Sequence, residues 1–383
     1  MDTKTISWLR LIRSENVTDT VFWMLLKKYH SAYAALEALP YLAKAGGKHG
    51  KIKIATEASV LAELHHAQKL SIKYIRANEK NYPKLLKYIP YPPPVISYIG
   101  SDRLFKNEGV AIVGSRNPSN AGLQIAISFA EKLGHAGFFT VSGLAKGIDT
   151  AAHKGSVKTG TIAVLAGGIN YIYPPENKRL YYEIIDNGGA IITEKPFNYK
   201  PTSYDFPKRN RIIAGIGAAT LVVEARRHSG TLISARLANE YNRIVFAIPQ
   251  AILNDKAQGN NDLLREGATI ALDAEDIIST LLPFSETKIT PDTNKKGNIY
   301  FIKENDTIML EPPSLNQSSY KNFNIKEETR AKILANLTYL PVSIENIHHI
   351  TEIPVIEIEH VILELKIAGR ITQTGRNIAL IKP

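Results

Sequence analysis

The sequence of 383 residues contains no cysteine, and this absence excludes disulfide bonds, cysteine-ligated zinc and thiol catalysis together. No apolar run approaches the roughly 20 residues that a membrane-spanning helix requires. The first residues carry Asp2, Arg10 and Arg13 without the apolar core of a signal peptide. We therefore expect a cytoplasmic protein without a membrane partner.

The composition is that of a globular, basic protein. Hydrophobic residues make up 44% of the chain and charged residues 22%, which is enough apolar material for a true core. The formal net charge is +11. A phosphate-bearing partner is a reasonable expectation, but net charge alone does not separate nucleic acid from other polyanions.

Changes of pattern divide the chain into five segments. We predict a helical domain over 1–80, a connector over 81–106, an α/β domain over 107–282, a linker over 283–320 and a further domain over 321–383. The connector contains Tyr91-Pro92-Pro93-Pro94, which is expected to be stiff and extended. The linker is polar and rich in Lys, Asn, Thr, Ser and Pro, with one possible short strand at 299–302.

The first segment has apolar residues at helical spacing from Trp8 to Leu26, and Gly46-Gly47 ends this pattern. We favour a small helical packing domain. The alternative is a helix-hairpin-helix module that touches the DNA backbone, but no glycine-rich hairpin is visible between the helices.

From residue 110 onward, short apolar runs alternate with amphipathic stretches, which predicts βαβ units and a doubly wound, mostly parallel sheet. The predicted strands are 110–113, 138–141, 161–165, 190–193, 220–223 and 244–248. Ligands of such sheets bind at the carboxyl ends of the strands. Small residues and cations follow these strands, as in Gly114-Ser115-Arg116 and Ser142-Gly143-Leu144-Ala145-Lys146. Glycine allows close backbone approach to an anion, so these turns predict a phosphate site.

Neither a dinucleotide nor a nucleoside triphosphate fits this pattern. The first turn, GSRNPSNAG, has Arg116 where a dinucleotide fingerprint needs glycine, and the P-loop motif is absent. Ser142 and His153 lack an orienting third group, so no catalytic residue is assigned. Asp149 and Glu224 are interpreted as capping or arginine-pairing acids. We predict neither a cofactor nor a metal.

A basic stretch precedes the strand at 220–223. Residues 200–243 contain eight basic and three acidic residues. Phe206 stands directly before the cluster Lys208-Arg209-Asn210-Arg211. Guanidinium groups suit phosphates, and an aromatic ring can stack on an unpaired base. The pattern therefore favours binding of single-stranded nucleic acid.

Five ordered motifs resemble the DNA processing protein A family, also called DprA or Smf. They are VAIVGSRNPSNAG (110–122), VSGLAKGIDTAAHKG (141–155), TIAVLAGGINYIYPPEN (161–177), FPKRNRIIAG (206–215) and SGTLISARLA (229–238). The resemblance covers roughly 105–285. It implies an extended Rossmann-like domain that binds single-stranded DNA, helps to load a RecA-type recombinase in natural transformation, and forms head-to-tail homodimers.

The resemblance and the charge pattern together predict ten DNA-binding residues. The family contacts fall on Arg116, Gly143, Phe206, Arg209 and Asn210, whereas Ser115, Lys146, Lys200, Lys208 and Arg236 are added by position or charge. Two other functions stay open. One is a phosphoribohydrolase-like enzyme, whose PGGxGTxxE motif is only echoed at 229–236, and the other is a pure protein-interaction scaffold.

The last segment predicts helices over 328–337, 343–349 and 355–367, followed by two strands around Thr374-Gly375. Three helices and a β-wing describe a winged helix, which the family commonly carries here. The presumed recognition helix has Glu357, Glu359 and Glu364 against Lys366 alone, whereas helices that enter a DNA groove are usually basic. We therefore expect this domain to bind a protein or another subunit rather than duplex DNA.

Overall fold

The computed structural model describes residues 2–254, 257–286, 325–374 and 377–381. The chain forms two compact units, one from residues 1–62 and 308–383 and one from residues 63–307. Most of the predicted linker, with its possible strand at 299–302, lies outside the described residues.

The N-terminal segment is helical, as predicted. Its helices are α1 (Thr3–Ile12), α2 (Asp19–Tyr29), α3 (Ala32–Ala45) and α4 (Glu57–Lys69). Thr18 and Ser31 cap α2 and α3 with their side-chain oxygens, which accept backbone N–H groups. The ring of Trp8 packs 5.0 Å from that of Phe22 in the small core.

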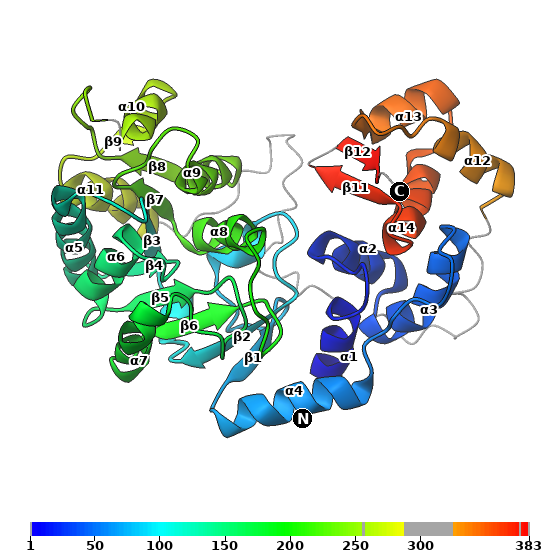
Figure 1. Ribbon diagram of the computed structural model, residues 1–383, viewed down its shortest axis with the longest axis horizontal. Coiled ribbons are helices and arrows are strands. Elements are labelled where there is room, and N and C mark those ends of the chain that lie inside the picture. The colour runs from blue at the N-terminus through cyan, green and yellow to red at the C-terminus, as the bar shows by residue number, and fades with distance from the viewer. Residues whose placement is uncertain (1, 255–256, 287–324, 375–376, 382–383) are drawn as a thin grey trace. The chain divides into compact units, whose positions relative to one another are not determined.

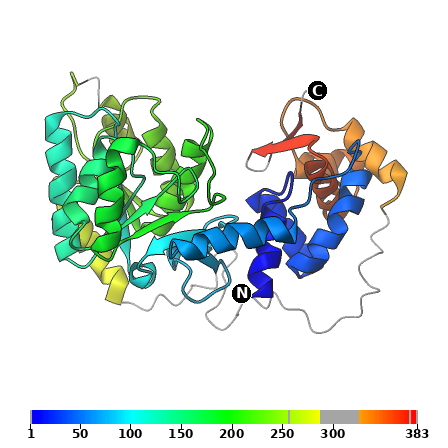
Figure 2. The ribbon, with the colours of Figure 1, turned by 60° about the horizontal axis from the view of Figure 1, so that its bottom comes forward.

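The second unit is built on a nine-stranded sheet (Figures 1 and 2). Its strands are β1 (Lys73–Arg76), β2 (Val95–Gly100), β3 (Gly109–Val113), β4 (Phe139–Ser142), β5 (Thr161–Val164), β6 (Ala190–Thr193), β7 (Ala219–Val222), β8 (Ile244–Ala247) and β9 (Thr269–Ile270). The order is β1-β2-β6-β5-β4-β3-β7-β8-β9, and all neighbours from β6 to β9 are parallel. This is the predicted doubly wound, Rossmann-like architecture.

The structure corrects the predicted connector over 81–106. Strand β2 lies within this range and pairs antiparallel with β1 on one side and β6 on the other. The three prolines end just before β2, where their missing N–H groups leave the strand's hydrogen bonds intact. The sheet therefore begins at Lys73, well before the predicted boundary at 107. The prolines predict a stiff connector, whereas they directly precede a strand of the sheet.

The strand order determines which face of the sheet each helix of this unit covers. They are α5 (Asn120–His135), α6 (Ile148–Ser156), α7 (Lys178–Asp186), α8 (Asp205–Ile216), α9 (Gly230–Glu240), α10 (Gln258–Arg265) and α11 (Ala274–Glu286), with short 3-10 turns at Leu85–Tyr88, Arg103–Lys106 and Pro175–Asn177. Because crossover connections are right-handed, the helices that follow β3 to β5 lie on one face, and those that follow β6 and β7 lie on the other. The order reverses between β3 and β7, which is where such sheets bind ligands.

The C-terminal segment has the predicted winged-helix order. It consists of α12 (Glu327–Ala335), β10 (Val342–Ser343), α13 (Ile344–Thr351), α14 (Val355–Ile367), β11 (Ile371–Thr374) and β12 (Asn377–Leu380). The hydroxyl of Ser343 accepts the N–H of Asn346 and so provides the predicted cap of α13. The turn at 374–375 lies partly outside the described residues.

Candidate nucleic-acid interface

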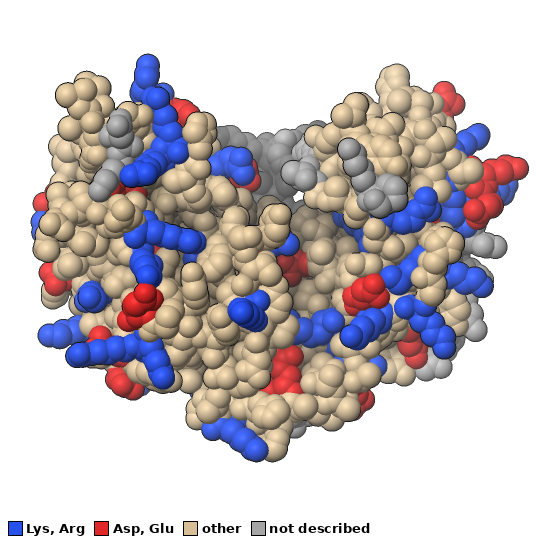
Figure 3. Space-filling model, in the orientation of Figure 1, with Lys and Arg blue, Asp and Glu red and all other residues tan. Residues whose placement is uncertain are grey.

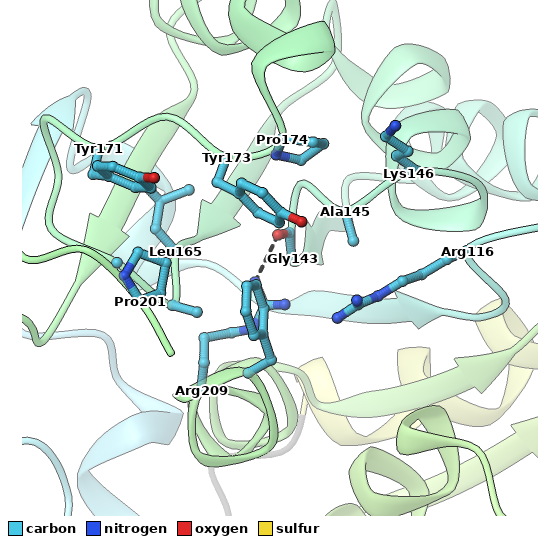
Figure 4. A pocket seen from close by; sticks show the side chains of 13 residues that line it. Arg116, Gly143, Ala145, Lys146, Leu165, Tyr171, Tyr173, Pro174, Pro201 and Arg209 are labelled. Atoms are coloured by element: carbon cyan, nitrogen blue, oxygen red, sulfur yellow. Dashed lines mark hydrogen bonds between the residues drawn. The ribbon is translucent and has the colours of Figure 1, made fainter. Parts of the chain in front are cut away.

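A cavity of about 220 Å³ opens at the carboxyl edge of the sheet (Figure 4). Its walls come from the turns that follow β3, β4 and β5 and from the start of α8. The lining residues are Arg116, Gly143, Ala145, Lys146, Leu165, Ala166, Gly167, Tyr171, Tyr173, Pro174, Pro201, Phe206 and Arg209. Five of the ten predicted site residues, from three separate segments of sequence, therefore converge here.

One wall of the cavity carries a cation beside a pair of aromatic rings. The guanidinium of Arg116 lies 5.1 Å from the centre of the Phe206 ring, within cation–π range. The centre of the Tyr173 ring lies 5.6 Å from that of Phe206, and the two ring planes are tilted by 56°. Arg116 itself is exposed. The arrangement offers a charge to a phosphate and flat apolar faces to a base at neighbouring positions.

Arg209 lies behind this wall and is only 5% exposed. Its Nη1 donates to the carbonyl oxygen of Gly143 at 2.6 Å and also to that of Val164. Burial lowers the pKa of Arg209 to about 10, with the charge of Asp149 opposing the shift, so Arg209 is positive at neutral pH. Because much of its hydrogen-bonding capacity is used on the backbone, Arg209 orders the turns after β4 and β5 as well as adding charge to the cavity.

The turn after β4 is held tightly around this arginine. The carboxylate of Asp149 accepts the N–H groups of Gly143 at 3.1 Å and Ala145 at 3.3 Å. Burial raises the pKa of Asp149, while the charge of Arg209 and these hydrogen bonds oppose the increase. A Cβ atom at Gly143 would lie 2.5 Å from the guanidinium of Arg209. Only glycine therefore lets the turn lie against the buried cation.

The groups that could serve in catalysis are engaged in the structure. The hydroxyl of Ser142 donates to the carbonyl oxygen of Ile112 at 2.7 Å. His153 is fully buried between the Leu144 N–H and the Thr161 hydroxyl. Burial, assisted by the positive charge of Arg209, lowers the pKa of His153 to about 3, so the ring is neutral at physiological pH.

The two acids interpreted as capping or arginine-pairing residues both accept N–H groups of the turns around the site. Glu224 is buried and accepts the N–H and hydroxyl of Ser119, the N-cap of α5. Asp149 binds backbone N–H groups, as described above. Both acids therefore fix the turns that carry the site.

The N-terminus of α8 is fixed by an acid as well. Asp205 accepts Lys195 Nζ at 2.7 Å, Tyr199 Oη at 3.0 Å and both the N–H and the hydroxyl of Thr202 at 2.8 Å. Burial opposes its ionisation, but these hydrogen bonds outweigh burial and hold the pKa of Asp205 well below its ordinary value. This cluster sets the position of Phe206, the next residue along the helix.

The other predicted site residues do not line the cavity. Ser115 supports the first turn: its N–H donates to the Glu224 carbonyl, and its hydroxyl accepts the N–H of Asn117. Asn210 accepts Arg209 Nε and donates to the carbonyl of Gly230. Lys200 and Lys208 are exposed. Arg236 lines a separate hollow between α9 and α10 and pairs with Glu240 at 3.6 Å.

Two further cations form ion pairs with acidic side chains and therefore do not belong to one continuous basic cluster. Lys146 lines the cavity but forms an ion pair with Glu176 at 2.5 Å, in which both side chains are more than half exposed. Arg211 pairs with Glu194 and is largely buried. The basic stretch around Phe206 thus divides into a buried part that fixes the fold and an exposed part that is accessible to a ligand.

Sequence reasoning missed the tyrosines of the cavity. Tyr171 and Tyr173 lie in the quoted motif after the third predicted strand, and Tyr173 is 46% exposed. The signal was available, since the turn after β5 meets those after β3 and β4 at the same sheet edge.

Two findings apply to the described residues alone. They contain no cluster of three or more His, Asp or Glu side chains placed to hold a metal ion. None of the helices in these residues combines the length and the apolar character that crossing a bilayer requires.

Three family models match successive segments of the chain. Residues 73–282 match the family model "DNA recombination-mediator protein A", residues 2–65 match "DprA-like N-terminal HHH domain", and residues 317–375 match "DprA winged helix domain". The model for residues 2–65 is a helix-hairpin-helix model, the alternative that sequence reasoning ranked second. Asn16 and His30 have left-handed φ angles of 60° and 61° between the helices, positions where glycine is usual. This explains why no glycine-rich hairpin was visible.

Protein Smf of Synechocystis is 35% identical over 324 residues, which cover 81% of this chain and 80% of that protein. DNA processing protein DprA of Bacillus subtilis is 38% identical over 214 residues, covering 55% and 71%. The X-ray structure of DprA from Streptococcus pneumoniae superposes with a TM-score of 0.59 at 30% identity, covering 73% of this chain and 98% of that one.

The structure of DprA from Helicobacter pylori, described for its single-stranded DNA binding mode, has a TM-score of 0.51 at 30% identity and covers 56% and 96%. Family models thus match all three folded segments in order, and the central match alone spans more than half of the chain. The chain belongs to the DNA recombination-mediator protein A family, also known as DprA or Smf.

Proposed function

We propose that this protein binds single-stranded DNA without cleaving it, and that the cavity at the carboxyl edge of the sheet holds one nucleotide of the strand. The observation that carries the proposal is the guanidinium of Arg116 lying over the Phe206 ring at the cavity wall. An exposed cation beside an aromatic face matches a phosphate followed by an unpaired base. The Helicobacter pylori relative, described as binding single-stranded DNA, supports the same ligand.

The proposed contacts divide by role. Arg116 and Lys146 contact phosphates, and the glycine-bordered turn at Gly143 lets the strand approach the backbone. Phe206 and Tyr173 stack on a base. Lys200, Lys208, Asn210 and Arg236 extend the path of the strand beyond the cavity, and Ser115 and Arg209 hold its walls.

Binding without catalysis is the proposed mode because the candidate nucleophile Ser142 and the candidate base His153 are engaged elsewhere. Ser142 donates to a strand carbonyl, and the buried His153 is neutral. A general base needs hydrogen-bond access to the proton that it removes. Incubation with AMP tests the enzyme alternative directly, since release of free adenine would contradict this mode.

The physiological role that we propose is protection of incoming single strands and loading of a RecA-type recombinase, by a cytoplasmic homodimer joined through the sheet domain. An exposed apolar surface supports self-association. Strand β9 forms one edge of the sheet; Ile270 within it is 49% exposed, and Leu272 just after it is 72% exposed. Light scattering of an Ile270→Lys variant tests the dimer, and recombinase filament assembly on protein-coated strands tests loading.

The central test measures oligonucleotide binding by fluorescence anisotropy at two salt concentrations. Affinity for a single strand should exceed affinity for a duplex of the same sequence. It should fall steeply with salt because phosphate contacts release counterions. Salt-independent binding, or equal affinity for the two DNA forms, would overturn the proposal.

Substitution of Phe206 tests the aromatic contact. The Phe206→Ala variant should lose about 1–3 kcal/mol of binding free energy, whatever the base sequence. Tyr204→Ala is the matched control, since Tyr204 is an aromatic residue two positions away, 78% exposed and outside the cavity. Equal losses in both variants would show that the Phe206 ring has no specific role.

A further inference from the structure

The recognition helix of the winged helix is covered in this structure. Most of α14 is buried, including the polar residues His360, Glu364 and Lys366. A helix that enters the major groove must present its polar face to the base edges. The covering elements are α2 and α3, which belong to the same compact unit as the winged helix.

The contact is close at the backbone. A Cβ atom at Gly46 would lie 2.2 Å from the carbonyl oxygen of Glu364 and 2.8 Å from Cβ of Ala368. Gly46 has an ordinary helical φ of −73°, so glycine is needed there for space rather than for backbone freedom. Arg370 Nη1 also donates to the carbonyl of Gly46 at 3.3 Å. The end of α3 is therefore fitted to α14.

The hairpin between α1 and α2 is engaged by the same helix. Nδ2 of Asn16, which lies in this hairpin, donates to the carbonyl of Ile367 at 3.0 Å, at the C-terminus of α14. In a helix-hairpin-helix module, the hairpin is the part expected at a DNA backbone. The hairpin of the first module therefore contacts the C-terminal end of the recognition helix of the second.

Buried charges join the two domains. The carboxylate of Glu364, 2% exposed, accepts Arg330 Nε at 2.9 Å and Nη2 at 3.0 Å, and His360 Nε2 at 2.9 Å. Lys28 of α2 reaches the ring of His360. Breaking such a buried network by removing one partner is costly, so it fixes the register of the contact. The charges are also complementary, because residues 2–56 contain nine basic and four acidic side chains.

We propose that α14 is an internal docking helix, which holds the N-terminal helical domain of its own chain and is thereby withheld from duplex DNA. The winged helix then acts as a clamp with the hairpin domain. This assigns the acidic character of α14 to a protein contact. The proposal does not depend on where single-stranded DNA binds.

The absence of cysteine allows a direct test, because a single engineered thiol is the only one in the full-length chain. Lys366 is only 8% exposed and its Nζ lies 3.7 Å from Sδ of Met24 in α2, so Lys366→Cys places the thiol in the covered face, whereas Glu359→Cys places it on the exposed face of the same helix. We expect maleimide to label the Lys366→Cys thiol at least about tenfold more slowly, since docking must open first. Equal rates would overturn the proposal.

Opening variants sharpen the test. Adding Gly46→Ala to the Lys366→Cys chain should bring labelling close to the exposed rate, because the new methyl group clashes across the contact. The neighbouring Ala45→Ser change is the control, since Ala45 is exposed. Asn16→Gly, which keeps the left-handed backbone and removes the cross-domain hydrogen bond, should act in the same direction as Gly46→Ala.

Two further outcomes decide the matter. Circular dichroism should show unchanged helix content in both opening variants, which excludes unfolding as the cause of faster labelling. Protection should also be independent of protein concentration. Protection that falls on dilution would place the N-terminal helices of a second copy on α14 and would overturn docking within one chain. Unchanged labelling in both opening variants would overturn it as well.

Discussion

At the scale of single residues, the two arginines of the cavity wall do different work. Arg116 is exposed and stacks on Phe206, whereas Arg209 is buried and donates to the carbonyl oxygens of Gly143 and Val164. When a buried carbonyl oxygen loses its hydrogen-bond donor, no new hydrogen bond offsets the free-energy cost of its desolvation. The same residue type thus serves ligand contact at one position and wall support at the other.

We predict that substitution will separate these roles. Arg209→Ala should destabilise the fold by about 2–4 kcal/mol and weaken DNA binding as a consequence. Arg116→Ala should leave the melting temperature within the error of the wild type and weaken binding at least about tenfold. Thermal unfolding and anisotropy on the same samples check both statements. Equal destabilisation by the two variants would contradict the division of roles.

Sequence alone could not make this distinction. The motif FPKRNRIIAG places Lys208, Arg209 and Arg211 close together, and their types predict a shared basic surface. A helix sends neighbouring residues to different faces, so Arg209 faces the strand ends and Arg211 faces Glu194. Which face of α8 is buried depends on how the helix packs on the sheet, and local sequence does not specify this tertiary contact.

At the scale of elements, the turn after β4 forms a tight assembly with α8. Gly143 provides both a carbonyl for Arg209 and the space that its guanidinium fills. We predict that Gly143→Ala will cost about 1–3 kcal/mol of stability through overpacking and will weaken binding by displacing the cavity wall. Chemical denaturation and anisotropy measure the two effects.

The matched control for this turn is Gly230→Ala. Gly230 begins α9 close to Asn210, and a Cβ atom there would meet nothing within 4 Å. Alanine favours the helical conformation over glycine, so this variant should be neutral or slightly stabilising. If Gly143→Ala were equally harmless, the close approach of Arg209 to this turn would not matter for the site.

The regular elements were predictable because their signals are local. The parallel strands from β3 to β8 are short apolar runs. Because the carboxyl ends of parallel strands lie at one edge of the sheet, Arg116, Gly143 and Lys146 could be predicted to lie close together. Strand β2 was missed because the prolines before it dominated the local pattern. The role of Tyr173 was missed because it depends on a ring contact with Phe206, which is 33 positions away.

At the scale of the whole molecule, the face drawn in Figure 3 carries its positive charge in several places rather than in one patch. Figure 3 shows Lys and Arg side chains in several separate groups, with acidic side chains between them. A net charge of +11 therefore favours approach of a polyanion in general, while the cavity supplies the specific contact. The overall charge would not have located the site.

The clamp between the helical domain and the winged helix should respond to pH through Lys28. Burial lowers the pKa of Lys28 to about 8, with the charge of Glu364 opposing the shift. The groups that face Lys28 are His360 and Glu364 of α14 and the ring of Tyr29 on its own helix. If opening restores an ordinary pKa near 10.5, the docked state holds fewer protons than the open state above pH 8.

Docking should therefore strengthen as pH rises from about 8 to about 10, and it should weaken as pH falls back through 8. Above pH 10 the trend should reverse, because burial raises the pKa of Tyr29 to about 12 and the open state then releases that proton first.

The readout is the labelling rate of the Lys366→Cys thiol divided by that of the Glu359→Cys thiol at each pH, a ratio in which the intrinsic reactivity of the thiolate largely cancels. A several-fold fall of this ratio between pH 8 and 10 is expected. Lys28→Met should abolish the fall. If the ratio instead rose between pH 8 and 10, the pKa of Lys28 would not be lowered by the contact, and this prediction would be wrong.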